Sequence, residues 1–77
     1  MRKYPARYRA VISALRDARR EAGLSQRALS GKLGEVFTYI HMIEAGQRSV
    51  LAEEFMAIAE ALGIDPAELM SRVVRRK

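Results

Sequence analysis

The sequence lacks several features that would define other classes of protein. None of its 77 residues is cysteine, so neither disulfides nor thiolate zinc sites can stabilise it. No apolar run approaches the roughly 20 residues of a membrane span, and the N-terminus has no secretory hydrophobic segment. Strand signals are missing, because β-branched residues are few and no long stretch alternates. A single histidine and no paired carboxylates at a plausible cleft leave no constellation for acid–base or nucleophilic catalysis.

These absences favour one cytoplasmic, all-α domain that is not an enzyme and needs no metal or cofactor. A chain of 77 residues allows a single domain, spanning 1–77, with a core at about 6–74 and basic, frayed ends. The C-terminal frayed end is expected to comprise Arg75, Arg76 and Lys77. At this length roughly 60% of the unfolded chain's surface becomes buried, which suits a compact helical bundle.

Five helices are predicted from the spacing of apolar residues and of helix-ending signals. The first spans about 6–22 and ends at Gly23. Its expected buried stripe comprises Tyr8, Val11, Ile12, Leu15 and Ala18. The fourth spans about 51–62, with Phe55, Ile58, Ala59 and Leu62 facing the core. The fifth begins at Pro66, with Asp65 as its N-cap.

The most informative segment lies between Leu24 and Gly46 and predicts two short helices joined by a tight turn. Ser25 is a suitable N-cap for a helix that begins at Gln26, and Gly34 provides a left-handed stop. Apolar residues at helical spacing then predict a second helix that ends at Gly46. Two such helices with a short glycine-containing turn form the helix-turn-helix unit, which places its second helix in the major groove of DNA.

This segment resembles the XRE (Cro and phage-repressor-like) family. The motifs that carry the resemblance are Leu24-Ser25-Gln26, Leu29-Ser30, Leu33-Gly34, the pair Ile40 and Ile43, and Glu44-Ala45-Gly46. The likeness continues through Phe55 to Leu69 and covers roughly residues 8–71. The resemblance implies a compact five-helix bundle that binds double-stranded DNA.

The resemblance also implies which residues contact DNA. In the family, the glutamine that opens the second helix contacts phosphate and supports a base-reading side chain, and Gln26 occupies that position. The base-reading positions lie in the first turn of the next helix and one turn further on. They correspond to Val36, Phe37, Thr38, His41 and Met42. Three of these side chains offer no hydrogen bonds, so they would read thymine methyl groups or groove shape, whereas Thr38 can hydrogen-bond and His41 can donate to a phosphate.

Charge is distributed unevenly along the chain. The net charge of +5 suits a polyanionic partner. Residues 1–34 hold nine Lys or Arg against two acids, whereas residues 35–71 hold one Arg against seven acids. The expected recognition helix has no Lys or Arg, so phosphate contacts must come from flanking residues. The candidates are Arg27, Lys32 and Arg48, with Arg2, Lys3 and Arg7 in the N-terminal arm.

Glu44 has a structural role by the same resemblance. In the family, an arginine near the end of the first helix pairs with this glutamate and ties that helix to the recognition helix. Arg19 stands at the matching position, so we expect a partly buried Arg19–Glu44 ion pair.

Two functions remain open at this point. The first is a sequence-specific transcriptional regulator, such as a repressor, that binds a palindromic operator as a homodimer. Its dimer surface is expected at the fifth helix and its approach, including Ile64, Met70 and Val74. The second is a protein-interaction module or antitoxin-type partner built on the same fold, because Val36, Phe37 and Met42 could form an apolar patch for a protein partner.

Overall fold

A computed structural model describes residues 5–76 and shows five α-helices in that range. Their bounds are α1 Ala6–Glu21, α2 Gln26–Lys32, α3 Tyr39–Glu44, α4 Ala52–Ala61 and α5 Pro66–Arg76. The all-α architecture with five helices confirms the fold class predicted from the sequence. No helix within the described range is both long and apolar enough to cross a lipid bilayer.

The helix ends follow from local chemistry. The Ser25 hydroxyl accepts a hydrogen bond from the Ala28 backbone N–H at 3.0 Å and caps α2, as predicted. Asp65 caps α5 in the same way through Ala67, also at 3.0 Å. Gly34, which follows the C-cap of α2, has a φ of +71°, a left-handed conformation that side chains with a Cβ rarely adopt.

The core forms where α1 meets the other helices. The buried apolar residues are Ala10, Ile12, Ala14, Leu15, Ala18, Leu29, Tyr39, Ile40, Ile43, Phe55, Ile58, Ala59, Leu69 and Val73. These side chains come from every helix, so no helix can detach without exposing apolar surface. Of the predicted core positions, Tyr8, Val11 and Leu62 are only half-buried.

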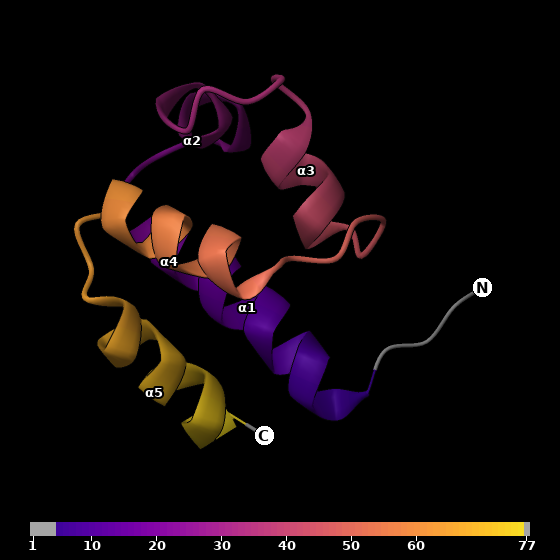
Figure 1. The fold of residues 1–77 in the computed structure, drawn as a ribbon, viewed down its shortest axis with the longest axis vertical. Helices are drawn as coiled ribbons and strands as arrows, with labels where there is room; N and C mark the ends of the chain where they lie inside the picture. The colour runs from indigo at the N-terminus through magenta and orange to yellow at the C-terminus, as the bar shows by residue number, and fades with distance from the viewer. Residues whose placement is uncertain (1–4, 77) are drawn as a thin grey trace.

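The other four helices are arranged around α1. The α2–α3 pair lies at one end of the molecule and α5 at the other, with α1 and α4 between them (Figure 1). The most extensive contacts join α1 to α5 and α2 to α3. This arrangement leaves the outer side of α2 and α3 uncovered by the rest of the described chain.

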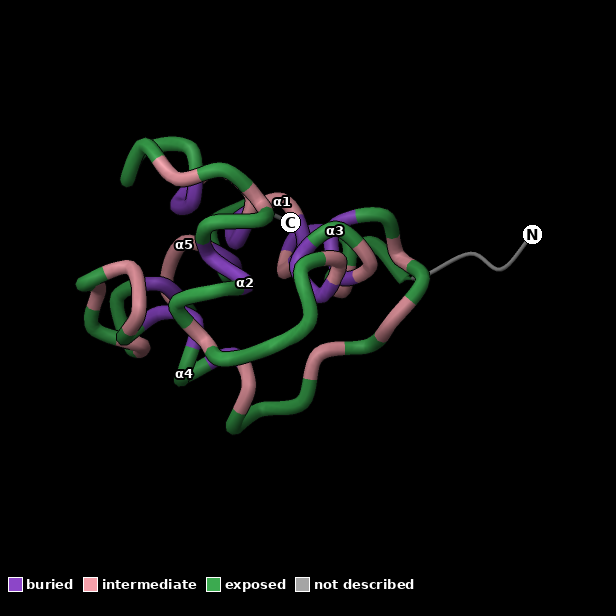
Figure 2. The backbone as a smooth tube through the Cα atoms, turned by 90° about the horizontal axis from the view of Figure 1, so that it is seen from above, coloured by how far each residue is buried: buried purple, intermediate pink, exposed green. Residues whose placement is uncertain are grey.

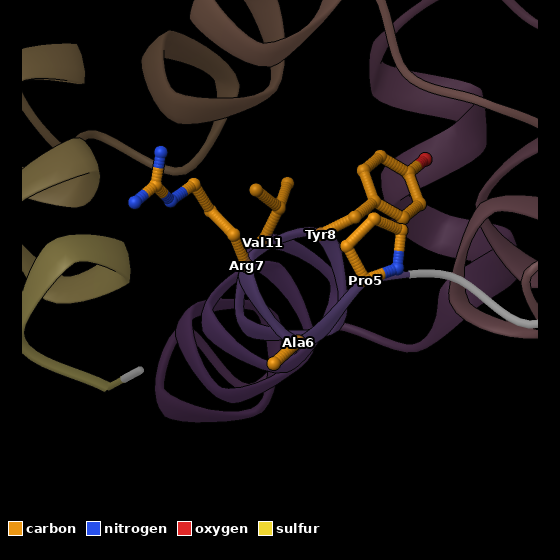
Figure 3. Close-up of a pocket in the computed structure, with 5 residues that line it drawn as sticks. All are labelled: Pro5, Ala6, Arg7, Tyr8 and Val11. Carbon is orange, nitrogen blue, oxygen red and sulfur yellow. The ribbon is translucent and has the colours of Figure 1, made fainter.

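Tyr8 is half-buried because its ring lies at the beginning of α1, beside a shallow hollow. The hollow is lined by Pro5, Ala6, Arg7, Tyr8 and Val11 (Figure 3). The Tyr8 hydroxyl accepts a hydrogen bond from the Val50 backbone N–H at 3.0 Å, so this side chain anchors the loop before α4 to α1.

Two predictions about helix ends were wrong. Residues 36–38 were expected in the first turn of the recognition helix, but α3 begins only at Tyr39. Arg75 and Arg76 were expected to be frayed, but both belong to α5. Arg76 donates to Asp17 Oδ2 on α1 at 2.7 Å, which holds the last turn of α5 in place. Lys77 and the arm residues Arg2 and Lys3 lie outside the described residues.

Candidate nucleic-acid interface

Ser30, which lies on α2, links this helix to α3 through a hydrogen bond. Its side chain is fully buried, and its hydroxyl donates to the Gln26 carbonyl oxygen at 2.9 Å. The same hydroxyl oxygen accepts a hydrogen bond from the Ile40 N–H at 3.0 Å. Because the first N–H groups of a helix have no partner within the helix, this bond both satisfies α3 and fixes its start against α2.

Glu44, the last residue of α3, lies at the centre of a buried polar cluster. The Arg19 guanidinium grips its carboxylate with two hydrogen bonds, from Nε to Oε2 at 2.7 Å and from Nη2 to Oε1 at 3.0 Å. The Gln26 amide donates to Oε1 at 2.8 Å, and Arg16 donates to the Glu44 backbone carbonyl at 2.8 Å. Arg19 also donates to the Leu24 carbonyl at 2.9 Å. The ion pair expected from the resemblance is therefore present, with two further partners.

The cluster keeps Glu44 ionised. Burial disfavours its charged form, but the hydrogen bonds from Arg19 and Gln26 outweigh that cost and hold the pKa of Glu44 below its ordinary value. An ionised carboxylate accepts hydrogen bonds and donates none. The direction of every hydrogen bond around Glu44 is therefore fixed.

His41 lies next to this cluster on the exposed side of α3. Its Nδ1 atom is 3.4 Å from Gln26 Oε1, so the Gln26 side chain bridges the buried Glu44 and the exposed His41. Gln26 thus contacts His41, one of the side chains predicted to read bases. The bridge also couples the position of the His41 ring to the core.

The turn between α2 and α3 carries exposed apolar side chains. Val36 and Phe37 are 62% and 60% exposed, in a stretch of exposed backbone at 34–37 (Figure 2). The Arg27 guanidinium lies 4.8 Å from the centre of the Phe37 ring, a cation–π contact across the turn. Val36 and Phe37 therefore lie on the turn and not on the recognition helix. On the turn, a DNA strand or a protein surface can reach them.

Two further predicted contact residues are half-buried. Thr38 immediately precedes α3, and its backbone carbonyl accepts the Met42 N–H at 2.9 Å. Met42 shares α3 with His41, but it is less exposed than its neighbour. The structure thus brings together His41 and Met42 on α3 and Thr38 at the position just before the helix.

Arg48 is the predicted contact that the structure places least favourably. Glu54 binds it with two hydrogen bonds, at 3.1 and 2.9 Å, and the Tyr39 ring lies 4.8 Å from its guanidinium carbon. The bond to Arg48 is the main cause of the lowered pKa of Glu54. Burial raises the pKa of Tyr39. The charge of Arg48 is thus compensated within the protein, whereas Arg27 and Lys32 are exposed on α2.

Sequence reasoning missed several members of this site. Ser30 was noted only as a small residue of the motif, and nothing in the sequence shows that its hydroxyl bonds to α3. Arg16 had a signal, because it precedes Arg19 by three positions and therefore lies on the same helical face. The Arg48–Glu54 contact joins a loop to a later helix and could not be read from periodicity.

Comparison with known proteins identifies the class of protein that this fold and site define. A family model described as Helix-turn-helix matches residues 15–69, which is more than half of the chain. An XRE-family like protein from Pseudomonas syringae pv. tomato str. DC3000 has a similar solved structure, with a TM-score of 0.84 and 33% identity. That match covers 91% of this chain and 85% of the other.

The chain therefore belongs to the XRE family of helix-turn-helix proteins, which are DNA-binding transcription regulators and not enzymes.

Two other solved structures have the same fold. The clp gene regulator ClgR from Corynebacterium glutamicum has a TM-score of 0.81 and 25% identity, over 95% of this chain and 78% of that one. A hypothetical transcription factor, NHTF, from Neisseria has a TM-score of 0.73 and 26% identity, over 90% of this chain and 83% of that one. A search of curated proteins finds no match.

Proposed function

We propose that this regulator is a sequence-specific repressor that binds a palindromic operator as a homodimer. The observation that carries the proposal is the bridge through Gln26, which fixes the exposed His41 against the buried Glu44. A side chain held in this way is suited to base recognition, because its position is set before DNA arrives. Thr38, just before α3, and Met42, on α3, complete the proposed base-reading set.

Arg27 and Lys32 supply the phosphate contacts in this proposal. Both are exposed on α2, beside the turn that leads to α3, and neither forms an ion pair with a described residue. Arg27 is further held over the Phe37 ring. Together they can grip a DNA strand while α3 enters the adjacent major groove.

The proposed dimer surface lies on α5. Met70 and Val74 are 43% and 61% exposed there, whereas Ile64 packs partly against the core. Two copies joined through α5 would present two recognition helices, about 34 Å apart on successive major grooves. Sedimentation should show a dimer that Val74→Asp weakens. A wild-type protein that stays monomeric at high concentration would contradict this part of the proposal.

Salt dependence of binding to random duplex DNA tests the interface. Wild-type affinity should fall steeply as salt rises. Arg27→Gln and Lys32→Gln should each weaken binding and reduce the slope of log affinity against log salt by about one. Arg75→Gln removes the same charge from α5, at the other end of the molecule, and should leave the slope unchanged (Figure 1).

A second candidate function is favoured by the exposure of Val36 and Phe37. A protein-interaction module, including an antitoxin that binds its toxin, would use these apolar side chains to bind a protein instead of DNA. This alternative predicts no measurable binding to random duplexes at low salt. Enrichment of a palindrome from a random oligonucleotide pool would support the repressor proposal and its two-fold symmetry together.

A further inference from the structure

The orientation of the Gln26 amide is determined by its buried neighbour. Its Nε2 atom lies 2.8 Å from Glu44 Oε1. The ionised carboxylate only accepts hydrogen bonds, so the amide must present its NH2 group there. Turning the amide over would place two acceptor oxygens against each other in a buried site. Gln26 Oε1 therefore faces the other way, toward His41.

The amide orientation in turn determines where His41 carries its proton. Gln26 Oε1 is an acceptor, and it lies 3.4 Å from His41 Nδ1. The contact is a hydrogen bond only if Nδ1 is the donor. In a neutral imidazole, one nitrogen carries the proton and the other has a free lone pair. Hence the neutral His41 ring has its proton on Nδ1 and an acceptor at Nε2.

The Nε2 atom is available to a ligand. His41 is exposed on α3, and within residues 5–76 the contact with Gln26 is the only hydrogen bond of its ring. The side chain also lies between Thr38 and Met42 in sequence, within the proposed base-reading set. An acceptor in this position requires a donor on the DNA.

We infer that neutral His41 recognises DNA as a hydrogen-bond acceptor and selects a base that presents an amino group in the major groove. Only adenine N6 and cytosine N4 present such a donor there. The inference rests on the proposed function and makes it more specific. It also replaces the phosphate contact expected from the sequence, because phosphate oxygens only accept hydrogen bonds and the neutral ring offers them no proton at Nε2.

The proton position can be measured without DNA. The chain has one histidine, so nitrogen NMR of the imidazole gives a single assignable pair of signals. At a pH where these spectra show a neutral ring, the wild type should have its proton on Nδ1. Gln26→Met, which lacks the accepting oxygen, should lose this preference and show a mixture of tautomers. A wild-type ring with its proton on Nε2 would overturn the inference, whether or not the variant folds.

The base preference is tested separately with DNA. Selection from a random pool should show a position in each half-site where the wild type prefers adenine or cytosine and His41→Ala has no preference. Replacing that base with an analogue that lacks only the amino group should weaken wild-type binding about three- to tenfold, the value of one hydrogen bond. The same replacement should leave His41→Ala unchanged.

The possible failures can be told apart. If wild type and His41→Ala bind the operator with the same base preference, the inference is wrong and the proposed function stands. If neither protein binds any duplex at low salt, the proposed function is wrong, and the inferred base preference is wrong as well. The NMR spectra still decide the proton position in that case.

Discussion

On the inner face of the helix-turn-helix unit, Ser30 and Glu44 are buried polar side chains, whereas on its outer surface Val36 and Phe37 are apolar and exposed. The inner polar groups all have partners, since no buried side-chain nitrogen or oxygen within residues 5–76 lacks a hydrogen bond. The outer apolar groups contribute little to the core. These four side chains depart from the usual distribution, in which apolar groups are buried and polar groups face water, whereas Leu29, Ile40 and Ile43 of the same unit follow it.

The comparison shows that the residues that position α3 differ from the residues that are exposed to a ligand. Apolar packing alone tolerates small shifts of one helix against another, but hydrogen bonds require particular distances and directions. Ser30 fixes the start of α3 and Glu44 fixes its end, each to a neighbouring helix. The side chains on the outer surface do not position α3, so they can differ according to the ligand without changing the fold. Substitutions on the inner face should therefore change stability, and those on the outer surface should change binding.

Glu44→Gln should have the largest effect. The substitution leaves the buried Arg19 guanidinium without a negative partner, so we expect the free energy of unfolding to fall by as much as about 3–5 kcal/mol. Glu21→Gln is the matched control, because it breaks an exposed ion pair with Arg72 that should contribute little to stability. Urea unfolding measures both values. If both variants lose the same free energy of unfolding, burial does not make the Glu44 cluster more stabilising than an exposed ion pair.

Acid should reproduce part of that effect in the unmodified protein. The pKa of Glu44 is lower in the folded chain than its ordinary value of 4.5. Its stabilising contribution is therefore complete above pH 4.5, and it is lost as the pH falls through the folded-state pKa. Unfolding measured across this acidic range should show a steeper loss for the wild type than for Glu44→Gln. Parallel curves would contradict the assignment.

Ser30→Ala should have a smaller effect than Glu44→Gln. The alanine leaves the buried Ile40 N–H without a partner, which costs about 1–3 kcal/mol. Ser71→Ala is the control, because within residues 5–76 the Ser71 hydroxyl is hydrogen-bonded only to the exposed Arg75 on the same helix. Thermal unfolding of the two variants measures the difference. If Ser30→Ala is as stable as its control, the link between α2 and α3 does not depend on this hydroxyl.

Sequence patterns predicted the parts of this structure that depend on local chemistry. The caps Ser25 and Asp65 and the helix stop at Gly34 could be identified because each acts within a few residues of its own position. Long-range polar contacts could not be identified in this way. Ser30 reaches Ile40, and Arg48 reaches Glu54, through geometry that exists only in the folded chain.

The start of α3 shows the same limit. The resemblance placed residues 36–38 in the first turn of the recognition helix, but the turn after Gly34 is longer and α3 begins at Tyr39. Tyr39 is buried, with its ring against Arg48. The contact of this ring with Arg48 forms only in the folded chain, so neither helical periodicity nor a family motif could reveal it.

Gly31→Ala should have the smallest effect and the opposite sign. Gly31 lies within α2 and directly follows the buried Ser30, but a Cβ atom added there would have no neighbour within 4 Å. Alanine should therefore raise the free energy of unfolding by up to about 1 kcal/mol, since glycine is the poorer helix former. Gly34→Ala is the contrasting control, because its φ of +71° would strain the alanine and lower stability. Because a Cβ atom at Gly31 would contact no other described part of the chain, a variant that gains stability but loses DNA affinity would show that a DNA strand passes close to this helix. Gain of stability with unchanged affinity would mean that the outer surface of α2 has no steric requirement for glycine.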